Sequence, residues 1–128
     1  TPHPGEMARL TGTPASDIVK DRVRVAKAFA DEYGVTVLLK GADTVIASGD
    51  SEEIFVNTSG NQGLAKGGSG DTLSGILGAL LAQGTAPFEA AAAAAYYHGK
   101  AAEYAALGKA LRSILATDLI EALPAVLP

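Results

Sequence analysis

The residues with the clearest chemical potential lie in a glycine-rich stretch that ends in an aspartate. Residues 57–75 hold six of the fifteen glycines and run through Gly68-Ser69-Gly70-Asp71 into an apolar segment. Residues without side chains let backbone N–H groups converge on an anion, and a following helix adds unpaired N–H groups and the positive end of its dipole. The stretch therefore predicts an oligophosphate site at Gly68, Ser69 and Gly70. The Asp71 carboxylate would stand beside it, able to take a proton from an attacking hydroxyl.

Two common phosphate-binding motifs do not fit this stretch. A Walker A loop needs Gly-Lys-Ser/Thr after its spaced glycines, whereas Ser69 directly follows Gly68 here. A dinucleotide-binding fingerprint would need a glycine at the position of Leu73. A simpler interpretation stays open on composition alone: a flexible loop in which Asp71 only caps the next helix, since Asp is among the commonest N-cap residues.

The elements that must position this loop follow from the apolar periodicity. A helix is expected from a cap at Ser16 to Tyr33, stopped by Gly34. A strand over 35–39, apolar at nearly every position, is expected to be buried on both faces. Two short strands should follow over 44–47 and 53–56, joined by a turn around Gly49-Asp50.

Helices dominate the second half of the chain. One is expected over 71–83, and a second, rich in small residues and able to pack closely, over 90–106, with Pro87 at a first helical position. A last short helix should be capped by Thr117 and curtailed by Pro124. His98 is expected to be a packed structural histidine. We expect one α/β unit over residues 1–128, with no repeat and no linker.

Composition narrows the function classes. The 128 residues (12.9 kDa) are 48% hydrophobic and 19% charged, which suits a single packed domain. A net charge of -4 without charge blocks argues against nucleic acid and anionic membranes as partners. The absence of cysteine excludes disulfides and thiolate metal sites and fits a cytoplasmic protein. The longest apolar stretch falls far short of the roughly 20 residues that span a bilayer.

The predicted sheet looks incomplete by itself. A strand as apolar as 35–39 needs sheet neighbours on both edges and a layer on each face, yet only two further short strands are visible. The chain also starts at Thr1-Pro2, without an initiator Met. We therefore expect an upstream segment to complete a larger sheet.

Several segments together resemble a known family. The Gly68–Asp71 run after Asn57-Thr58-Ser59-Gly60-Asn61 is similar to the anion-hole and catalytic-base region of the ribokinase-like superfamily. The chain further resembles the ADP/ATP-dependent NAD(P)H-hydrate dehydratases in three segments: Thr1-Pro2-His3-Pro4-Gly5-Glu6, Lys40-Gly41-Ala42-Asp43-Thr44 and Asn61-Gln62-Gly63-Leu64-Ala65. Four motifs in family order imply the C-terminal part of a three-layer α/β/α ribokinase-like domain, incomplete without its upstream half.

The resemblance also implies roles. Asp71 would be the catalytic base and would contact the hydrated NADH or NADPH, together with His3. The nucleotide would be bound by one strand-end segment, by the glycine loop and by one asparagine: Lys40, Gly41, Ala42, Asp43, Thr44, Gly68, Ser69, Gly70 and Asn61. ADP or ATP would be the co-substrate, and Mg²⁺ would arrive with the nucleotide, since no residue cluster suggests a protein-bound metal. The activity would be a lyase reaction in metabolite repair, and we expect a homo-oligomer.

Two other functions stay open on the sequence. One is a ribokinase-like kinase of a small hydroxylated metabolite, which would use the same Asp71 and the same anion hole. The other is a nucleotide-binding fragment without turnover. The segments Thr1–Glu6 and Lys40–Thr44 favour the dehydratase, because sugar and vitamin-precursor kinases are not expected to share them. The choice between ADP and ATP is not decided.

Overall fold

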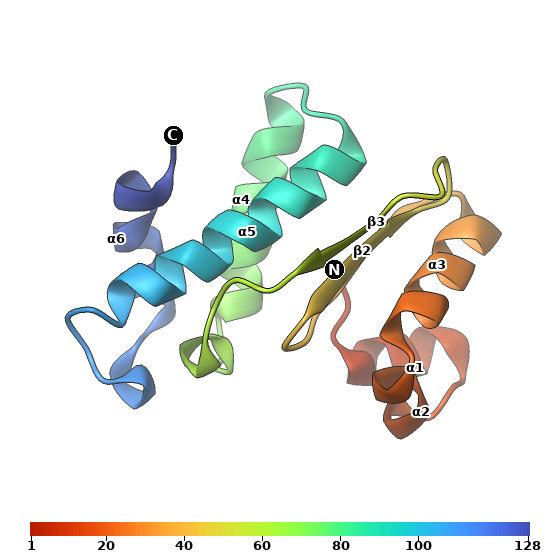
Figure 1. Cartoon of the computed structure of the whole chain (residues 1–128), viewed down its shortest axis with the longest axis horizontal. Coiled ribbons are helices and arrows are strands. Elements are labelled where there is room, and N and C mark those ends of the chain that lie inside the picture. Colours follow the sequence, from red (N-terminus) through yellow and green to blue (C-terminus); the bar gives the residue numbers. More distant parts are fainter. The chain divides into compact units, whose positions relative to one another are not determined.

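The computed structural model describes residues 1–128, which form two compact units, Thr1–Asn57 and Thr58–Pro128. The first unit contains the helices α1 (Pro4–Thr11), α2 (Ala15–Lys20) and α3 (Arg22–Tyr33) and the strands β1 (Thr36–Leu39), β2 (Thr44–Ser48) and β3 (Ile54–Asn57). The strands form one antiparallel sheet in the order β1-β2-β3, and α3 packs against β1 and β2 (Figure 1). The expected strands are therefore confirmed, with ends shifted by one residue.

The helical start of this unit differs from the expectation in two ways. Residues Pro4–Thr11 form a helix that the sequence did not reveal, and His3 caps it. The expected helix from Ser16 to Tyr33 is two helices, and Ser16 lies inside the first instead of capping it. The break falls at Asp21, whose carboxylate accepts a hydrogen bond from the N–H of Arg24 (3.2 Å) and so starts α3 anew.

The core of the first unit lies between the sheet and its helices. Alternate residues of β1 and β2 pack with Ala26 and Ala30 of α3 and with Met7 of α1; these strand residues are Val37, Leu39, Val45 and Ala47. Leu38 and Ile46 point to the opposite face and are equally buried, so the prediction that this strand is buried on both faces is confirmed. Gly49 follows β2 where a Cβ atom would lie 3.1 Å from the Cα of Gly34, so only glycine allows this close turn.

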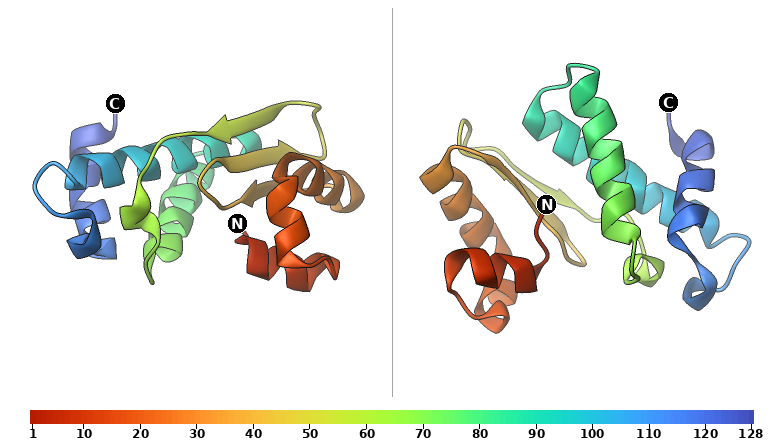
Figure 2. Two further views of the ribbon diagram at one scale, coloured as in Figure 1. Left: turned by 60° about the horizontal axis from the view of Figure 1, so that its bottom comes forward. Right: turned by 180° about the vertical axis from the view of Figure 1, so that it is seen from behind.

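The second unit is helical. It consists of the 3₁₀ turn η1 (Gln62–Leu64), α4 (Ser69–Ala82), α5 (Pro87–Ala105), the 3₁₀ turn η2 (Leu111–Ser113) and α6 (Ala116–Val126). Both α4 and α6 pack against α5 (Figure 2). Buried alanines along α5 allow this close packing, as predicted: Ala90, Ala91, Ala94, Ala95, Ala101 and Ala102. No helix of the chain combines the length and the apolar character needed to cross a membrane.

The helix ends in this unit correct three expectations. α4 begins at Ser69, so Asp71 is its third residue and not an N-cap. α6 begins after Leu115, and Thr117 lies within its first turn, while Asp118 accepts the N–H of Leu115 (2.8 Å) in place of a threonine cap. Pro124 lies inside α6, which continues to Val126. The prediction of Pro87 at a first helical position is confirmed.

Candidate active site

The N-terminus of α4 leaves backbone donors unused. Its N-cap residue, Gly68, has a left-handed backbone (φ 86°) and no side chain that could cap the helix. The N–H of Ser69 donates to Lys66 O (3.3 Å), and the N–H of Thr72 donates to Gly68 O (3.1 Å). The N–H groups of Gly70 and Asp71 lie between them and find no acceptor in the protein. Two neighbouring donors at the positive end of a fourteen-residue helix are therefore available to an anion.

Asp71 stands beside these donors with its side chain open to solvent. It is exposed, and its carboxylate makes no hydrogen bond or ion pair with another protein group. A structural cap would accept a hydrogen bond from the backbone of the first turn, and α4 has no such bond. The reading of Asp71 as a mere helix cap is therefore wrong, and its carboxylate is free to accept a proton from a bound ligand.

Ser69 is fixed from the interior of the second unit. Its Oγ lies 3.2 Å from His98 Nε2 of α5, and both residues are buried, at 5% and 6% exposure. Because the N–H of Ser69 also has an acceptor, both its N–H and its hydroxyl are engaged within the protein. His98 is therefore the packed structural histidine that was predicted.

The loop before α4 is tied to α5 by three further hydrogen bonds. Gly60 N–H donates to Glu103 Oε1 (2.9 Å), and Ser59 Oγ donates to Tyr96 O (3.0 Å). Asn61 donates its side-chain amide to Ala102 O (2.9 Å) and accepts from Gly63 N–H (2.9 Å). Both polar atoms of the Asn61 side chain thus hold the loop in shape, so a nucleotide contact by this residue stays a prediction.

Glu103 is the centre of this attachment and was not identified from the sequence. The ion pair with Lys100 (2.6 Å) and the hydrogen bond from Gly60 hold the pKa of Glu103 below its ordinary value. A charged carboxylate accepts from a backbone N–H more strongly than a neutral group does. No sequence signal points to the pairing of Glu103 with Gly60, because the two residues are 43 positions apart.

In the first unit, His3 and Lys40 meet at Glu6. His3 Nδ1 accepts the N–H groups of Gly5 (3.0 Å) and Glu6 (3.2 Å), while Glu6 Oε2 accepts the N–H of His3 (2.7 Å). Lys40 Nζ lies 3.6 Å from Glu6 Oε2, and its own N–H donates to Pro2 O (2.8 Å). The hydrogen bond from His3 and the charge of Lys40 lower the pKa of Glu6. The segment Thr1–Glu6 and the end of β1 are thereby joined.

The segment Lys40–Thr44 forms the turn between β1 and β2. Thr44 Oγ1 accepts the N–H of Gly41 (3.2 Å) and donates to Gly41 O (3.1 Å), which closes the turn. Gly41, Ala42 and Asp43 are exposed, as a binding loop requires. The Arg22 guanidinium lies against Gly41 and forms no ion pair, so the turn carries a second cation that the sequence did not reveal.

The predicted site residues therefore divide between the two units. His3 and Lys40–Thr44 belong to the first unit and are connected through Glu6. Asn61 and Gly68–Asp71 belong to the second and are held by α5. The chain has no cluster of three or more His, Asp or Glu side chains that could hold a metal ion.

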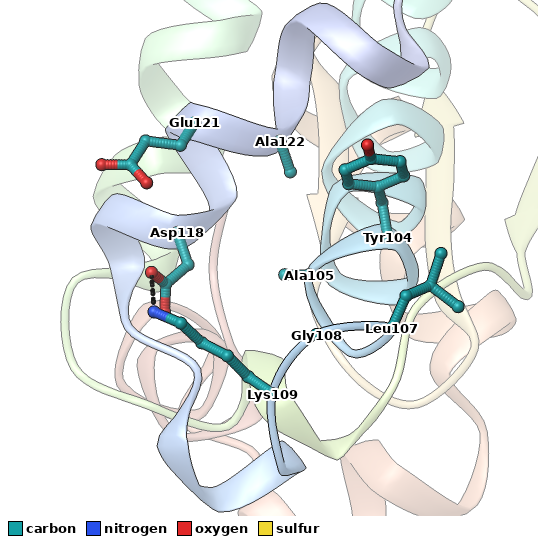
Figure 3. Close-up of a pocket in the computed structure, with 8 residues that line it drawn as sticks. All are labelled: Tyr104, Ala105, Leu107, Gly108, Lys109, Asp118, Glu121 and Ala122. Carbon is teal, nitrogen blue, oxygen red and sulfur yellow. Dashed lines mark hydrogen bonds and ion pairs between the residues drawn. The ribbon is translucent and has the colours of Figure 1, made fainter.

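A separate hollow of about 520 Å³ lies between the end of α5 and α6 (Figure 3). It is lined by Tyr104, Leu107 and the Lys109–Asp118 ion pair, among others. Lys109 and the N–H of Leu115 lower the pKa of Asp118, so this carboxylate serves the start of α6. None of the predicted site residues borders this hollow, so the free donors of α4 remain the candidate site.

Comparisons with known proteins identify the relatives of this chain. The family described as NAD(P)H-hydrate dehydratase matches residues 1–125. The bifunctional NAD(P)H-hydrate repair enzyme Nnr of Moorella thermoacetica is 50% identical over 99% of this chain, which spans 24% of that protein. The ADP-dependent (S)-NAD(P)H-hydrate dehydratase of Neisseria meningitidis is 53% identical over 80% of the chain, which corresponds to 34% of the longer protein.

Solved structures show the same relationship. The ADP/ATP-dependent NAD(P)H-hydrate dehydratase of Bacillus subtilis, co-crystallised with ATP/Mg²⁺ and soaked with CoA, matches 98% of this chain and 46% of its own, with a TM-score of 0.92 and 40% identity. A ribokinase-like superfamily protein of Enterococcus faecalis matches with a TM-score of 0.79 and 34% identity. The expected α/β, ribokinase-like fold class is confirmed, and the chain spans a quarter to about half of the relatives named here. This chain belongs to the NAD(P)H-hydrate dehydratase family.

Proposed function

We propose that this chain is the C-terminal portion of a single ribokinase-like domain that dehydrates hydrated NADH or NADPH with the help of ADP or ATP. The observation that carries the proposal is the N-terminus of α4, where the free N–H groups of Gly70 and Asp71 adjoin an exposed carboxylate. The names of the relatives supply the substrate: they are NAD(P)H-hydrate dehydratases, and one is called ADP-dependent.

The remaining half of the domain would come from upstream sequence, because the relatives are two to four times as long as the stretch that matches. The apolar β1 and β2, buried on both faces, would then belong to a larger sheet. We further propose a cytoplasmic homo-oligomer whose partners are the two small-molecule substrates. The acidic composition supports this choice over nucleic acid or a membrane surface.

Two segments of the chain would bind the nucleotide, as the family resemblance implies. The terminal phosphates would accept the N–H groups of Gly70 and Asp71, where the helix dipole favours negative charge. The turn Lys40–Thr44 would hold the rest of the adenine nucleotide, with Lys40 as a partly buried cation at the end of a strand. Mg²⁺ would arrive on the phosphates, because a single free carboxylate beside the donors, that of Asp71, is too few ligands for a resident metal site.

The reaction would begin when Asp71 accepts the proton of the hydroxyl on the hydrated ring. The oxygen takes the terminal phosphoryl group of ADP or ATP, which leaves AMP or ADP. The free N–H groups would stabilise the negative charge that develops on the phosphoryl group in flight. The lone pair of the ring nitrogen then expels phosphate, and loss of a proton from the neighbouring ring carbon restores NADH or NADPH.

His3 would contact the dinucleotide substrate. Its Nδ1 accepts two backbone N–H groups, so the ring proton is on Nε2, which lies 3.5 Å from Glu6 Oε1. The His3 side chain is half exposed, and its Nε2 edge would therefore be the part that meets a ligand. Glu6 and Lys40 would fix the orientation of this ring.

The test is the variant Asp71→Asn in the full-length protein that contains this sequence. Turnover of hydrated NADH with ADP or ATP is followed by absorbance at the reduced-nicotinamide band. We expect kcat to fall by about 10²- to 10⁴-fold, the usual contribution of a general base, while nucleotide affinity stays within a few-fold. Glu89→Gln is the matched control, because Glu89 is also an exposed third residue of a helix.

The outcomes separate the three functions. Full activity of Asp71→Asn contradicts the role of the base. Nucleotide consumption that depends on a different hydroxylated metabolite, with no effect on hydrated NADH, identifies a kinase instead. Nucleotide binding to the full-length protein without any turnover indicates a binding module.

A further inference from the structure

The first turn of α4 contains the free donors and Asp71, and it lacks the usual means of holding a helix start in place. Gly68 provides no side-chain cap, and the amides of the second and third residues have no acceptor. Such a turn frays readily, since no side chain caps its free N–H groups. Precise placement of a base and of oxyanion donors is nevertheless what catalysis needs.

We propose that His98 is a positioning residue that holds the first turn of α4 in its catalytic geometry through Ser69. This inference rests on the proposed function of the α4 N-terminus. The hydrogen bond between Ser69 Oγ and His98 Nε2 (3.2 Å) is a buried side-chain contact that anchors the first residue of α4. Asp71 follows two residues later on the same turn.

The anchor is rigid because α5 is fixed where His98 lies. Gly99 packs so closely against Ser59 that a Cβ atom would lie 2.6 Å from the Ser59 carbonyl carbon. On the next turns of the helix, Ala102 O and Glu103 hold Asn61 and Gly60. One stretch of α5, residues 98–103, therefore holds both the glycine-rich loop and the helix that follows it. The hydrogen bond from His98 therefore fixes the position of Ser69 relative to this stretch.

The hydrogen bond between Ser69 and His98 matters because both side chains are buried. Both side chains are less than a tenth exposed, so water cannot readily replace either partner when the other is removed. Loss of the bond leaves a buried polar group unsatisfied on one side, and the turn must shift or open to hydrate it. Displacements of about 1 Å in a catalytic group are enough to reduce a rate by about 10²-fold.

The experiment uses Ser69→Ala, His98→Ala and His98→Gln in the full-length protein. Hydrogen exchange of the Thr72 amide, which donates to Gly68 O, reports the first turn directly. We expect both alanine variants to speed this exchange and to lower kcat by about 10²-fold. His98→Gln, whose amide reaches the place of Nε2, should restore most of both values.

The double variant Ser69→Ala/His98→Ala should be no slower than either single variant, because both remove the same bond. Tyr97→Phe is the control, since its hydroxyl makes no hydrogen bond in the protein and it neighbours His98. If His98→Ala does not fold, Ser69→Ala alone tests the inference, since this variant removes only a hydroxyl group.

Wild-type kcat together with unchanged Thr72 exchange in Ser69→Ala overturns the inference. So does a loss of kcat in His98→Gln as large as that in His98→Ala. If the unaltered protein has no dehydratase activity, the proposed function fails instead. The exchange measurement then still shows whether His98 holds the turn.

Discussion

The helices α1 and α4 begin in opposite ways. α1 has a complete capping box: His3 Nδ1 accepts two backbone N–H groups, and Glu6 returns a carboxylate to the N–H of His3. α4 begins at a left-handed glycine with no side-chain cap and leaves two N–H groups unsatisfied. Both helices carry an acidic residue at the third position, yet only Glu6 is used to cap its own helix.

The difference separates a helix start whose donors are used to stabilise the fold from one whose donors stay open. A capping side chain contributes about 1 kcal/mol, so an uncapped α4 gives up that stability. The hydrogen bond between His98 and Ser69 holds the turn from its buried side instead, and the free N–H groups stay unobstructed. In α1 the cap itself occupies the donors, and no anion can reach them.

The largest effect is expected when a glycine with a left-handed backbone is replaced at the start of α4, and the same change at the end of α1 is the comparison. Gly68→Ala should cost about 1–3 kcal/mol, because φ is 86° and the new Cβ would lie 3.1 Å from Ala116 Cβ. Nucleotide affinity should fall with it, since the free donors of α4 move. The measurements are urea unfolding and nucleotide titration of the full-length protein.

Gly12→Ala is the matched control, because Gly12 closes α1 with φ 71° and has nothing within 4 Å of a new Cβ. Gly12→Ala should lower the free energy of unfolding by about 1 kcal/mol, through the strain of a left-handed backbone alone, and should leave the nucleotide affinity unchanged. Equal effects of both variants on nucleotide binding would remove the distinction between the two helices.

A smaller effect is expected when the cap of α1 is removed. His3→Ala should lower the free energy of unfolding by about 1 kcal/mol, since two backbone N–H groups lose their acceptor. His3→Asn should restore this stability, because Asn is among the best N-cap residues. The Asn variant should still show a raised KM for hydrated NADH if the Nε2 edge meets the substrate. Unchanged KM would assign His3 to the fold alone.

The elements that could be predicted from the sequence are those that local patterns encode. The apolar and β-branched run at residues 35–39, the turn at Gly49 and the stop at Gly34 are local signals. The structure has a strand over Thr36–Leu39, a turn at Gly49 and the end of α3 at Gly34. The start of α1 was missed because a histidine seldom caps a helix, although Pro4 and Glu6 stand at the positions that a capped start prefers. The break at Asp21 was missed because a short polar side chain can end one helix and begin the next without disturbing the apolar period.

The candidate site could be predicted only in part from local patterns. The glycine run that leads into α4 is contiguous, so an anion site could be predicted from it. The contacts that shape it are not contiguous: Ser69 meets His98 across 29 positions, and Gly60 meets Glu103 across 43. Such pairs depend on how α5 packs, and no local pattern encodes that packing. The roles of the individual site residues accordingly stay predictions.

The smallest effect concerns the charge that completes the α1 cap. The His3 N–H and then Lys40 lower the pKa of Glu6 from its ordinary value of 4.5. A carboxyl with a depressed folded pKa stabilises the fold above its unfolded pKa and loses that contribution as the pH falls through the folded pKa. Glu6→Gln should therefore lower the free energy of unfolding, measured by urea, only slightly at pH 7. The loss should be well under 1 kcal/mol, because the side chains of Glu6 and Lys40 are 43% and 26% exposed. The difference from wild type should shrink as the pH falls below about 4.5.

Asp17→Asn tests whether this pH dependence belongs to the cap. Asp17 also forms an exposed ion pair near a helix start, with Lys20 (3.1 Å), but it accepts no backbone N–H. Its effect on the midpoint should be smaller than that of Glu6→Gln at pH 7, since the capping hydrogen bond is missing. A Glu6→Gln midpoint that equals wild type from pH 4 to pH 7 would show that the negative charge of Glu6 adds nothing to the cap, since Gln can still accept the N–H of His3. The contrast with α4 would then depend on side-chain hydrogen bonds and not on charge.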